Sequence, residues 1–200
     1  MPMPRVYTVG HSNHQPDAFV ELLLQHHIGL VIDVRAQPYS AYTTWFNQEA
    51  LAGLLQRYGV AYRFEGAALG ARPTDPACYA EGRVMYARVA AQPAFAAALN
   101  CAVADAGRTP TVLMCAEADP LSCHRSILLG QTLDASGVDL VHIRADGALE
   151  SQEQLSQRLM RERNLDQPNL FESPELRRER AYREQEQEIA WRLNARRGTS

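Results

Sequence analysis

The stretch from Pro110 to Gly137 constrains the fold most, because a short apolar run leads into a polar loop and then into an amphipathic segment. Residues 111–114 are typical of a buried strand. Residues 125–135 carry apolar side chains at helical spacing, and Gly137 is placed to end a helix. Loops that follow the carboxyl ends of strands form the ligand crevice of open α/β sheets. We therefore expect the loop from Cys115 to Arg125 to belong to a ligand-binding or catalytic site.

The rest of the chain alternates in the same way between short apolar runs and amphipathic segments. Strands are expected at 6–9, 30–34, 60–64, 111–114 and 138–143, and helices at 16–27, 47–58, 78–90, 93–106, 125–135 and 151–163. Parallel strands need such helical crossovers. The pattern predicts a three-layer, Rossmann-like α/β domain over residues 1–165, with a mostly parallel five-stranded sheet and helices on both faces. Residues 166–200 are expected to form a charged helical tail.

A parallel sheet would bring distant polar segments to one edge. Residues 10–13, 33–35 and 115–117, together with Arg144, each follow an expected strand. Their side chains would then meet in one crevice.

Composition excludes several classes of protein. The formal net charge of -3 argues against bulk binding of nucleic acid. All 20 basic residues are Arg, so no chemistry based on Lys is available. No apolar run approaches the length of a membrane span, and neither an export leader nor a membrane partner is expected. Four cysteines in such a chain indicate free thiols in a reducing cytoplasm, where we expect the protein.

The expected strand-to-helix loop contains the strongest catalytic candidates, which are Cys115, Glu117, Cys123 and His124. A neighbouring imidazole, guanidinium or helix N-terminus lowers the pKa of a thiol and favours the thiolate, so Cys115 and Cys123 are rival nucleophiles. Cys115 could equally be a small buried side chain that ends a strand. Glu117 could serve as a general acid or base, or could cap backbone N–H groups. Arg125 could bind a substrate anion or could brace the loop by pairing with Glu117 or Asp119.

The first two strand ends add further candidates. His11 could transfer protons or could be a hydrogen-bonded structural histidine. Asp33 and Arg35 share one face of an extended chain, so they could contact a ligand or form an internal ion pair. Ser12 and Asn13 could donate or accept hydrogen bonds to a ligand. We group Ser12, Asn13, Asp33, Arg35 and Arg125 as candidate ligand-binding residues.

A metal site is also chemically conceivable, because the loop contains thiols, an imidazole and a carboxylate. The spacing of Cys115, Cys123 and His124 matches no common zinc module. Cys123 and His124 at a helix start would also point about a third of a turn apart. We therefore expect no metal at this loop, and the residues identify no cofactor.

These motifs resemble the bacterial and archaeal family called domain of unknown function 488. The resemblance covers about residues 5–165 and rests on four motifs, TVGHSN at 8–13, VIDVR at 31–35, WFNQEAL at 45–51 and LMCAEADPLSCHRS at 113–126. It implies no activity. A fainter similarity to rhodanese-like and Cys-phosphatase domains concerns a cysteine that ends a strand beside an I-D-V-R strand. Ten positions separate Cys115 from Arg125, so the compact anion loop of those enzymes is not reproduced.

The tail contains a second kind of motif. Gln167, Leu170 and Phe171 belong to a QPNLF segment that is similar to the pentapeptide with which bacterial repair and replication proteins bind the sliding clamp. Alternatively, Leu170 and Phe171 anchor the tail onto the domain.

Two classes of function follow. The first is an enzyme that uses the Cys, His, Arg and Glu side chains of the crevice on a small anionic substrate, such as a nucleotide or phosphorylated metabolite. The second is a non-catalytic ligand-binding or DNA-maintenance accessory protein that the QPNLF segment recruits to a partner.

Overall fold

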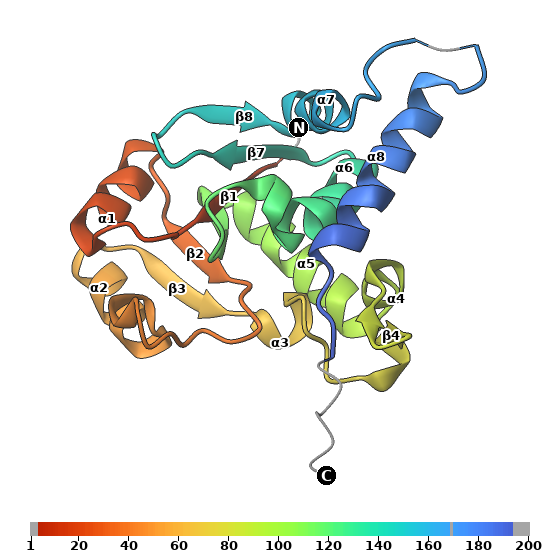
Figure 1. Cartoon of the computed structure of the whole chain (residues 1–200). Coiled ribbons are helices and arrows are strands. Elements are labelled where there is room, and N and C mark those ends of the chain that lie inside the picture. Colours follow the sequence, from red (N-terminus) through yellow and green to blue (C-terminus); the bar gives the residue numbers. More distant parts are fainter. Residues whose placement is uncertain (1–3, 169, 194–200) are drawn as a thin grey trace.

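A computed structural model describes residues 4–168 and 170–193, and Figure 1 shows their arrangement around a central sheet. This sheet has six strands. The strands are β1 (Arg5–Gly10), β2 (Leu30–Asp33), β3 (Ala61–Phe64), β6 (Thr111–Cys115), β7 (Asp139–Ile143) and β8 (Leu149–Ser151). Their order is β3-β2-β6-β1-β7-β8, and only the pairing of β8 with β7 is antiparallel. The expected α/β fold and its five parallel strands are confirmed. The short edge strand β8 was not predicted.

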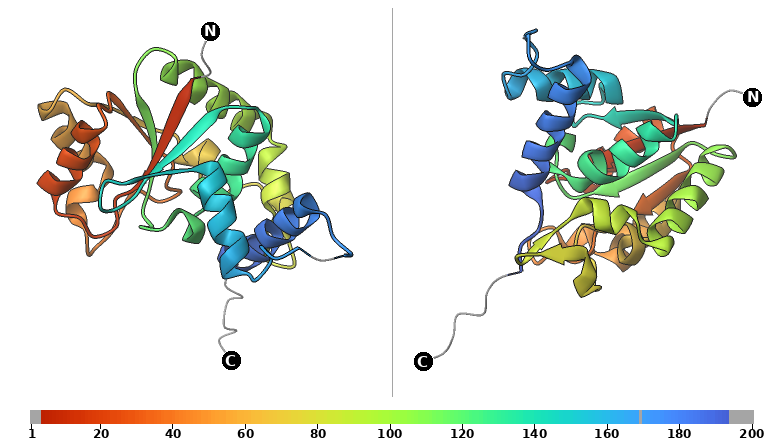
Figure 2. Two further views of the ribbon diagram at one scale, coloured as in Figure 1. Left: turned by 90° about the horizontal axis from the view of Figure 1, so that it is seen from above. Right: turned by 90° about the vertical axis from the view of Figure 1, so that its right-hand side faces the viewer.

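Helices cover both faces of this sheet (Figure 2). On one face lie α1 (Pro16–Gln25), the 3₁₀ turn η1 (Thr44–Phe46) and α2 (Gln48–Arg57). On the other lie α4 (Tyr86–Ala90), α5 (Pro93–Ala106), α6 (Gln131–Ala135), α7 (Gln152–Glu162) and α8 (Pro174–Ile189). Because successive strand residues point to opposite faces, Val31 and Val112 join the first core whereas Ile32 and Leu113 join the second. The sheet is therefore buried on both sides.

The expected helix at 78–90 is wrong in its first half. The structure has a 3₁₀ turn, η2 (Pro76–Cys78), then a hairpin of β4 (Tyr79–Ala80) and β5 (Arg83–Val84), and only then α4. Glu81 and Gly82 form the two-residue turn with φ angles of 50° and 72°. Two successive residues in the left-handed region match the twist of paired strands and interrupt a helix. A further short helix, α3 (Gly66–Leu69), lies where the sequence predicted neither a helix nor a strand.

The segment that follows β6 departs from a regular helix. After β6 come the 3₁₀ turn η3 (Pro120–Ser122), a π-helix over Arg125–Gly130 and then α6. The expected helix at 125–135 is thus confirmed in extent, although its first part has π-helical hydrogen bonds. Such wide turns are frequent at functional sites.

The tail packs against the α/β domain. Ala181 and Tyr182 of α8 are buried in the same core as α5 and α7. The Tyr182 hydroxyl accepts a hydrogen bond from Gln152 at 2.9 Å and lies 2.6 Å from the hydroxyl of Ser156. Beyond α8, the backbone N–H of Val84 donates to the carbonyl of Trp191 at 2.9 Å. The end of the described chain is therefore fixed beside the β4–β5 hairpin.

Candidate functional site

The ends of β1, β2 and β6 meet at one edge of the sheet. Beyond β1, the backbone N–H of His11 donates to the carbonyl of Cys115 at 2.9 Å. Beyond β2, the backbone N–H of Val34 donates to the carbonyl of Met114 at 3.0 Å. These bonds extend the parallel register past the strands, so the imidazole of His11 and the guanidinium of Arg35 lie together, with 3.1 Å between Nε2 and Nη1. Segments more than a hundred residues apart therefore share one site.

The thiols and the imidazole of the β6 loop form a compact cluster. Nδ1 of His124 lies 3.7 Å from Sγ of Cys115 and 3.7 Å from Sγ of Cys123. A carboxylate oxygen of Glu117 lies 3.0 Å from Sγ of Cys115. The other ring nitrogen of His124 is 3.1 Å from the carbonyl oxygen of Leu69. Because a carbonyl can only accept, this Nε2 carries a hydrogen and the ring orientation is fixed.

This environment shifts the pKa values of the two thiols in opposite directions. A hydrogen bond from Cys123, together with the positive charge of His124, lowers the pKa of Cys115 well below its usual value, although burial opposes this effect. Burial, followed by the hydrogen bond with Cys115, raises the pKa of Cys123 well above its usual value. Burial lowers the pKa of His124, but the sulfur of Cys115 outweighs it and the net shift is upward. Burial and the same sulfur raise the pKa of Glu117.

The cluster lies at the wall of a pocket of about 250 Å³. Of the candidates from the sequence, Arg35, Cys115, Glu117, Cys123 and His124 line this pocket. Further lining residues were not predicted, and they include Gln37, Arg72, Tyr86, Ser122, Ile189 and Trp191. The guanidinium of Arg72 lies 3.7 Å above the ring of Trp191. Arg72 follows α3 and Trp191 follows α8, and no sequence pattern pointed to either residue.

Arg35 is held by an internal ion pair. Its Nη2 lies 2.6 Å from Oδ2 of Asp33 and its Nε lies 2.9 Å from Oδ1, so the contact is bidentate. Asp33 is fully buried and also accepts a hydrogen bond from the hydroxyl of Tyr62 at 2.8 Å. Asp33 and Arg35 thus form the internal ion pair that was expected as one of two alternatives. Arg35 nevertheless also lines the pocket.

His11 lies behind Arg35 and is not among the pocket-lining residues. Its ring stacks on Phe46 with 4.3 Å between the ring centres. Burial, reinforced by the charge of Arg35, lowers the pKa of His11 to about 4. A neutral His11 therefore supports Arg35 from behind.

Arg125 does not lie where an anion clamp would be. It is fully buried, and its guanidinium donates to the carbonyls of Glu117 at 2.5 Å and Ala118 at 2.8 Å. The expected ligand-binding role is not supported by this position, whereas bracing of the loop is observed, through carbonyl oxygens rather than carboxylates. Gly10 makes the close approach feasible, because a Cβ atom there would lie 1.8 Å from the carbonyl oxygen of Glu117.

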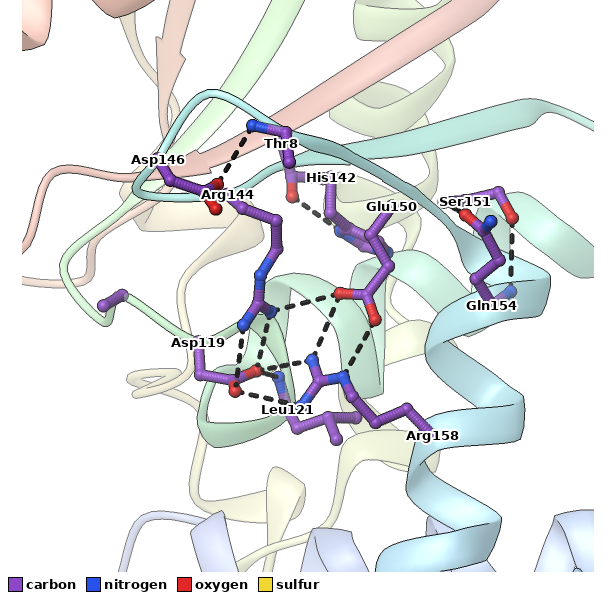
Figure 3. Close-up of polar contacts among 12 residues, drawn as sticks. Thr8, Asp119, Leu121, His142, Arg144, Asp146, Glu150, Ser151, Gln154 and Arg158 are labelled. Carbon is purple, nitrogen blue, oxygen red and sulfur yellow. Dashed lines mark hydrogen bonds and ion pairs between the residues drawn. The ribbon is translucent and has the colours of Figure 1, made fainter.

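The loop is also held from outside by Asp119 (Figure 3). Asp119 caps η3 by accepting from the backbone N–H of Leu121 at 2.9 Å. Its carboxylate pairs with Arg144, beyond β7, at 3.2 Å and with Arg158 of α7 at 2.9 Å. Glu150 of β8 pairs with the same two arginines, so the four charges balance. Arg144 follows its strand as expected, but it belongs to this ion-pair network and does not line the pocket.

Three other groups of candidates lie outside the pocket. Ser12 and Asn13 form a turn after β1, in which the Ser12 hydroxyl donates to the side chain of Asn13 at 3.3 Å. Leu170 and Phe171 are 97% and 93% exposed, so little of either side chain is buried against the domain. The side-chain amide of Gln167 donates to the neighbouring Asp166 at 2.9 Å.

The sheet order and the strand-end pocket define a Rossmann-like α/β protein. A family model, Domain of unknown function DUF488, matches residues 15–131, more than half of the chain, and the chain belongs to this family. Comparisons with curated proteins and with solved structures found no significant match. In the part of the chain that the structure describes, no helix has the length and apolar character needed to cross a bilayer.

Proposed function

We propose that this protein is an enzyme that uses the sulfur of Cys115 as a nucleophile on a small anionic substrate, such as a nucleotide or a phosphorylated metabolite. The observation that carries the proposal is the convergence of Cys115, Glu117 and His124 on one wall of the pocket. A thiol, an imidazole in contact with it and a second proton-transfer group are the components of covalent catalysis.

Positive charge in the pocket supports an anionic substrate. Arg72 is exposed, and within the described residues no carboxylate forms an ion pair with it. Arg35 also lines the pocket, although Asp33 balances its charge and Asp33, Phe46 and His11 occupy most of its N–H groups. The guanidinium of Arg72 stacks on Trp191 and donates one hydrogen bond, from Nη1 to the side-chain oxygen of Gln37 at 3.2 Å, so its other N–H groups can still bind a phosphate or carboxylate group.

The roles of the three groups follow from their contacts. The sulfur of Cys115 forms a bond to the electrophilic atom of the substrate, and the bond to the leaving group breaks. Glu117, whose raised pKa favours the protonated form, gives the leaving group its proton. Water then cleaves the thioester-like or thiophosphate-like intermediate, which restores the thiolate and returns the proton to Glu117. His124 stabilises the thiolate.

Alkylation tests this proposal. We expect iodoacetamide at neutral pH to modify Cys115 faster than the exposed Cys101, because the thiolate is the reactive form. Mass spectrometry of tryptic peptides would give both rates, and Cys101→Ser is the matched control. In protein stripped of metal with a chelator, a Cys115 rate no greater than that of Cys101 would count heavily against thiol catalysis.

A second function is supported by the exposure of Leu170 and Phe171. An exposed apolar pair is suited to insertion into a pocket of another protein, and the QPNLF segment suits a sliding clamp. Pull-down with a purified clamp tests this idea. Equal recovery of the wild type and of the double variant Leu170→Ala, Phe171→Ala would reject recruitment by this segment.

A further inference from the structure

The cluster of two thiols and an imidazole has the dimensions of a metal site. The sulfur atoms of Cys115 and Cys123 and a ring nitrogen of His124 all lie within 4.8 Å of one another, and all three residues are buried. In a tetrahedral site with Zn–S of about 2.3 Å and Zn–N of about 2.0 Å, sulfur and nitrogen lie about 3.5 Å apart. Both observed sulfur-to-nitrogen distances are 3.7 Å. The two sulfur-to-nitrogen distances are therefore close to those of such a site, and the two sulfurs lie within 4.8 Å of each other.

The backbone explains why the side chains converge. Cys123 has φ of -136° and ψ of 144°, so it is extended, whereas His124 is in the right-handed helical region. The expectation that these neighbours diverge assumed that both were helical, and it is wrong. The change of conformation between them turns both side chains toward Cys115.

Groups around the three atoms resemble the surroundings of a metal ligand. Nε2 of His124 bonds to the carbonyl of Leu69, which leaves Nδ1 directed at the two sulfurs. Metal-binding histidines usually have such a partner on the other nitrogen. The backbone N–H of Arg125 points at Sγ of Cys123 at 3.5 Å and would stabilise a thiolate there. Two thiolates and a neutral imidazole would also balance the charge of a divalent cation.

We propose that Cys115, Cys123 and His124 bind one Zn²⁺ ion, with the fourth coordination position open to the pocket. Soft thiolates and imidazole are the ligands that zinc prefers, and three protein ligands with one open position are typical of reactive zinc sites. Arg35 and Arg72 line the same pocket, so an anion could occupy the fourth position.

The inference goes beyond the proposed function and affects it. Zinc would coordinate the sulfur of Cys115, so this sulfur would be a weaker nucleophile in the metal-bound protein. Rapid alkylation of Cys115 in zinc-free protein supports the proposed function whatever the outcome with zinc. The two proposals therefore fail independently.

Metal titration of the full chain tests the site. Protein stripped with a chelator is titrated with Zn²⁺ against a chromophoric chelator, and separately with Co²⁺. We expect one equivalent of tight binding, release of protons and a sulfur-to-cobalt charge-transfer band. Zinc should also protect both Cys115 and Cys123 of the wild type from alkylation. Binding without the sulfur-to-cobalt band, or without this protection, would place the metal elsewhere and overturn the proposal.

Variants identify the ligands. We expect Cys123→Ser to weaken zinc binding by more than about 100-fold, since loss even of an outer-shell partner costs about 10–100-fold. Cys101→Ser, at an exposed thiol, should bind as the wild type does. Circular dichroism establishes that each variant is folded, and the wild-type protection assay remains decisive if Cys123→Ser is not. Equal affinity of folded Cys123→Ser and wild type would refute the site.

Discussion

Arg158 holds Asp119 through two parallel hydrogen bonds, with 3.0 Å from Nη1 to Oδ2 and 2.9 Å from Nη2 to Oδ1. One residue lies on α7 and the other lies in the middle of the loop that presents Cys115 and Cys123. The contact explains why a helix that does not line the pocket still determines the position of the cluster. The positive charge of Arg158 also faces Glu150, which accepts a hydrogen bond from the same guanidinium.

Replacement of this arginine should loosen the loop. We expect Arg158→Gln to lower the free energy of unfolding by roughly 1–3 kcal/mol, the usual range for a hydrogen bond to a charged group. It should also change the alkylation rate of Cys115. Arg161→Gln, at an exposed position of the same helix, is the control and should have little effect. Urea unfolding and alkylation measure the two effects, and identical behaviour of the two variants would contradict the anchoring role.

Arg72, which lines the pocket, should matter for ligand binding rather than for the stability of the fold. Its guanidinium is exposed and stacked on Trp191, so Arg72→Gln should leave the melting temperature almost unchanged. We expect the affinity for pyrophosphate to fall by about tenfold, which corresponds to about 1.4 kcal/mol. Calorimetry measures this change, with Arg57→Gln of α2 as the control. Unchanged pyrophosphate affinity in Arg72→Gln would remove this residue from the anion site.

Acid should destabilise the protein through His142. This residue is fully buried between the hydroxyl of Thr8 at 2.7 Å and the side-chain oxygen of Gln152 at 2.8 Å. Burial lowers its pKa to about 4, so the unfolded chain binds the proton first as the pH falls. The contribution of His142 to the free energy of unfolding is therefore fully present above about pH 6.5. It is lost as the pH falls toward 4, by on the order of 3 kcal/mol.

Denaturant unfolding between pH 4 and 7 tests the role of His142. We expect His142→Gln to reduce the slope of stability against pH without abolishing it, because the lowered pKa of His11 acts in the same direction. An unchanged slope in a folded His142→Gln variant would mean that His142 is not the titrating group.

Two glycines give a matched pair of substitutions. A methyl group at Gly10 would collide with the carbonyl oxygen of Glu117 at 1.8 Å and with the guanidinium of Arg125 at 2.5 Å. Gly53, in α2, has nothing within 4 Å of such a group. We expect Gly10→Ala to destabilise the protein strongly, by roughly 3 kcal/mol or more, whereas Gly53→Ala should stabilise it by about 0.5–1 kcal/mol. Comparable melting temperatures for the two variants would disprove the tight packing at Gly10.

Much of the fold could be predicted because the strands are short, apolar and separated by amphipathic segments. The same alternation predicted that His11, Arg35 and Cys115 lie at one edge, since parallel strands direct their carboxyl ends to the same side. Edge strand β8 has three residues and only one apolar side chain, Leu149, so its signal was too weak. The β4–β5 hairpin was missed because the alanine-rich surroundings favour a helix and the Glu81–Gly82 turn is the only local contrary signal.

The site was predicted less completely than the fold. Charged residues are ambiguous in a sequence, and Arg125 shows why, because its Nη1 and Nη2 donate to two backbone carbonyls that no pattern reveals. Arg72 and Trp191 are 119 positions apart and meet only because α8 crosses the domain. Such contacts depend on tertiary packing rather than on local spacing.

The attachment of Trp191 to Val84 makes the pocket depend on the last described residues. Ile189 and Trp191 form part of its lining, and the backbone N–H of Val84 holds the carbonyl of Trp191. A chain truncated before Ile189 would keep strands β1 to β7 but would lack this wall. Cys115 and Cys123 would then be less enclosed than in the full chain.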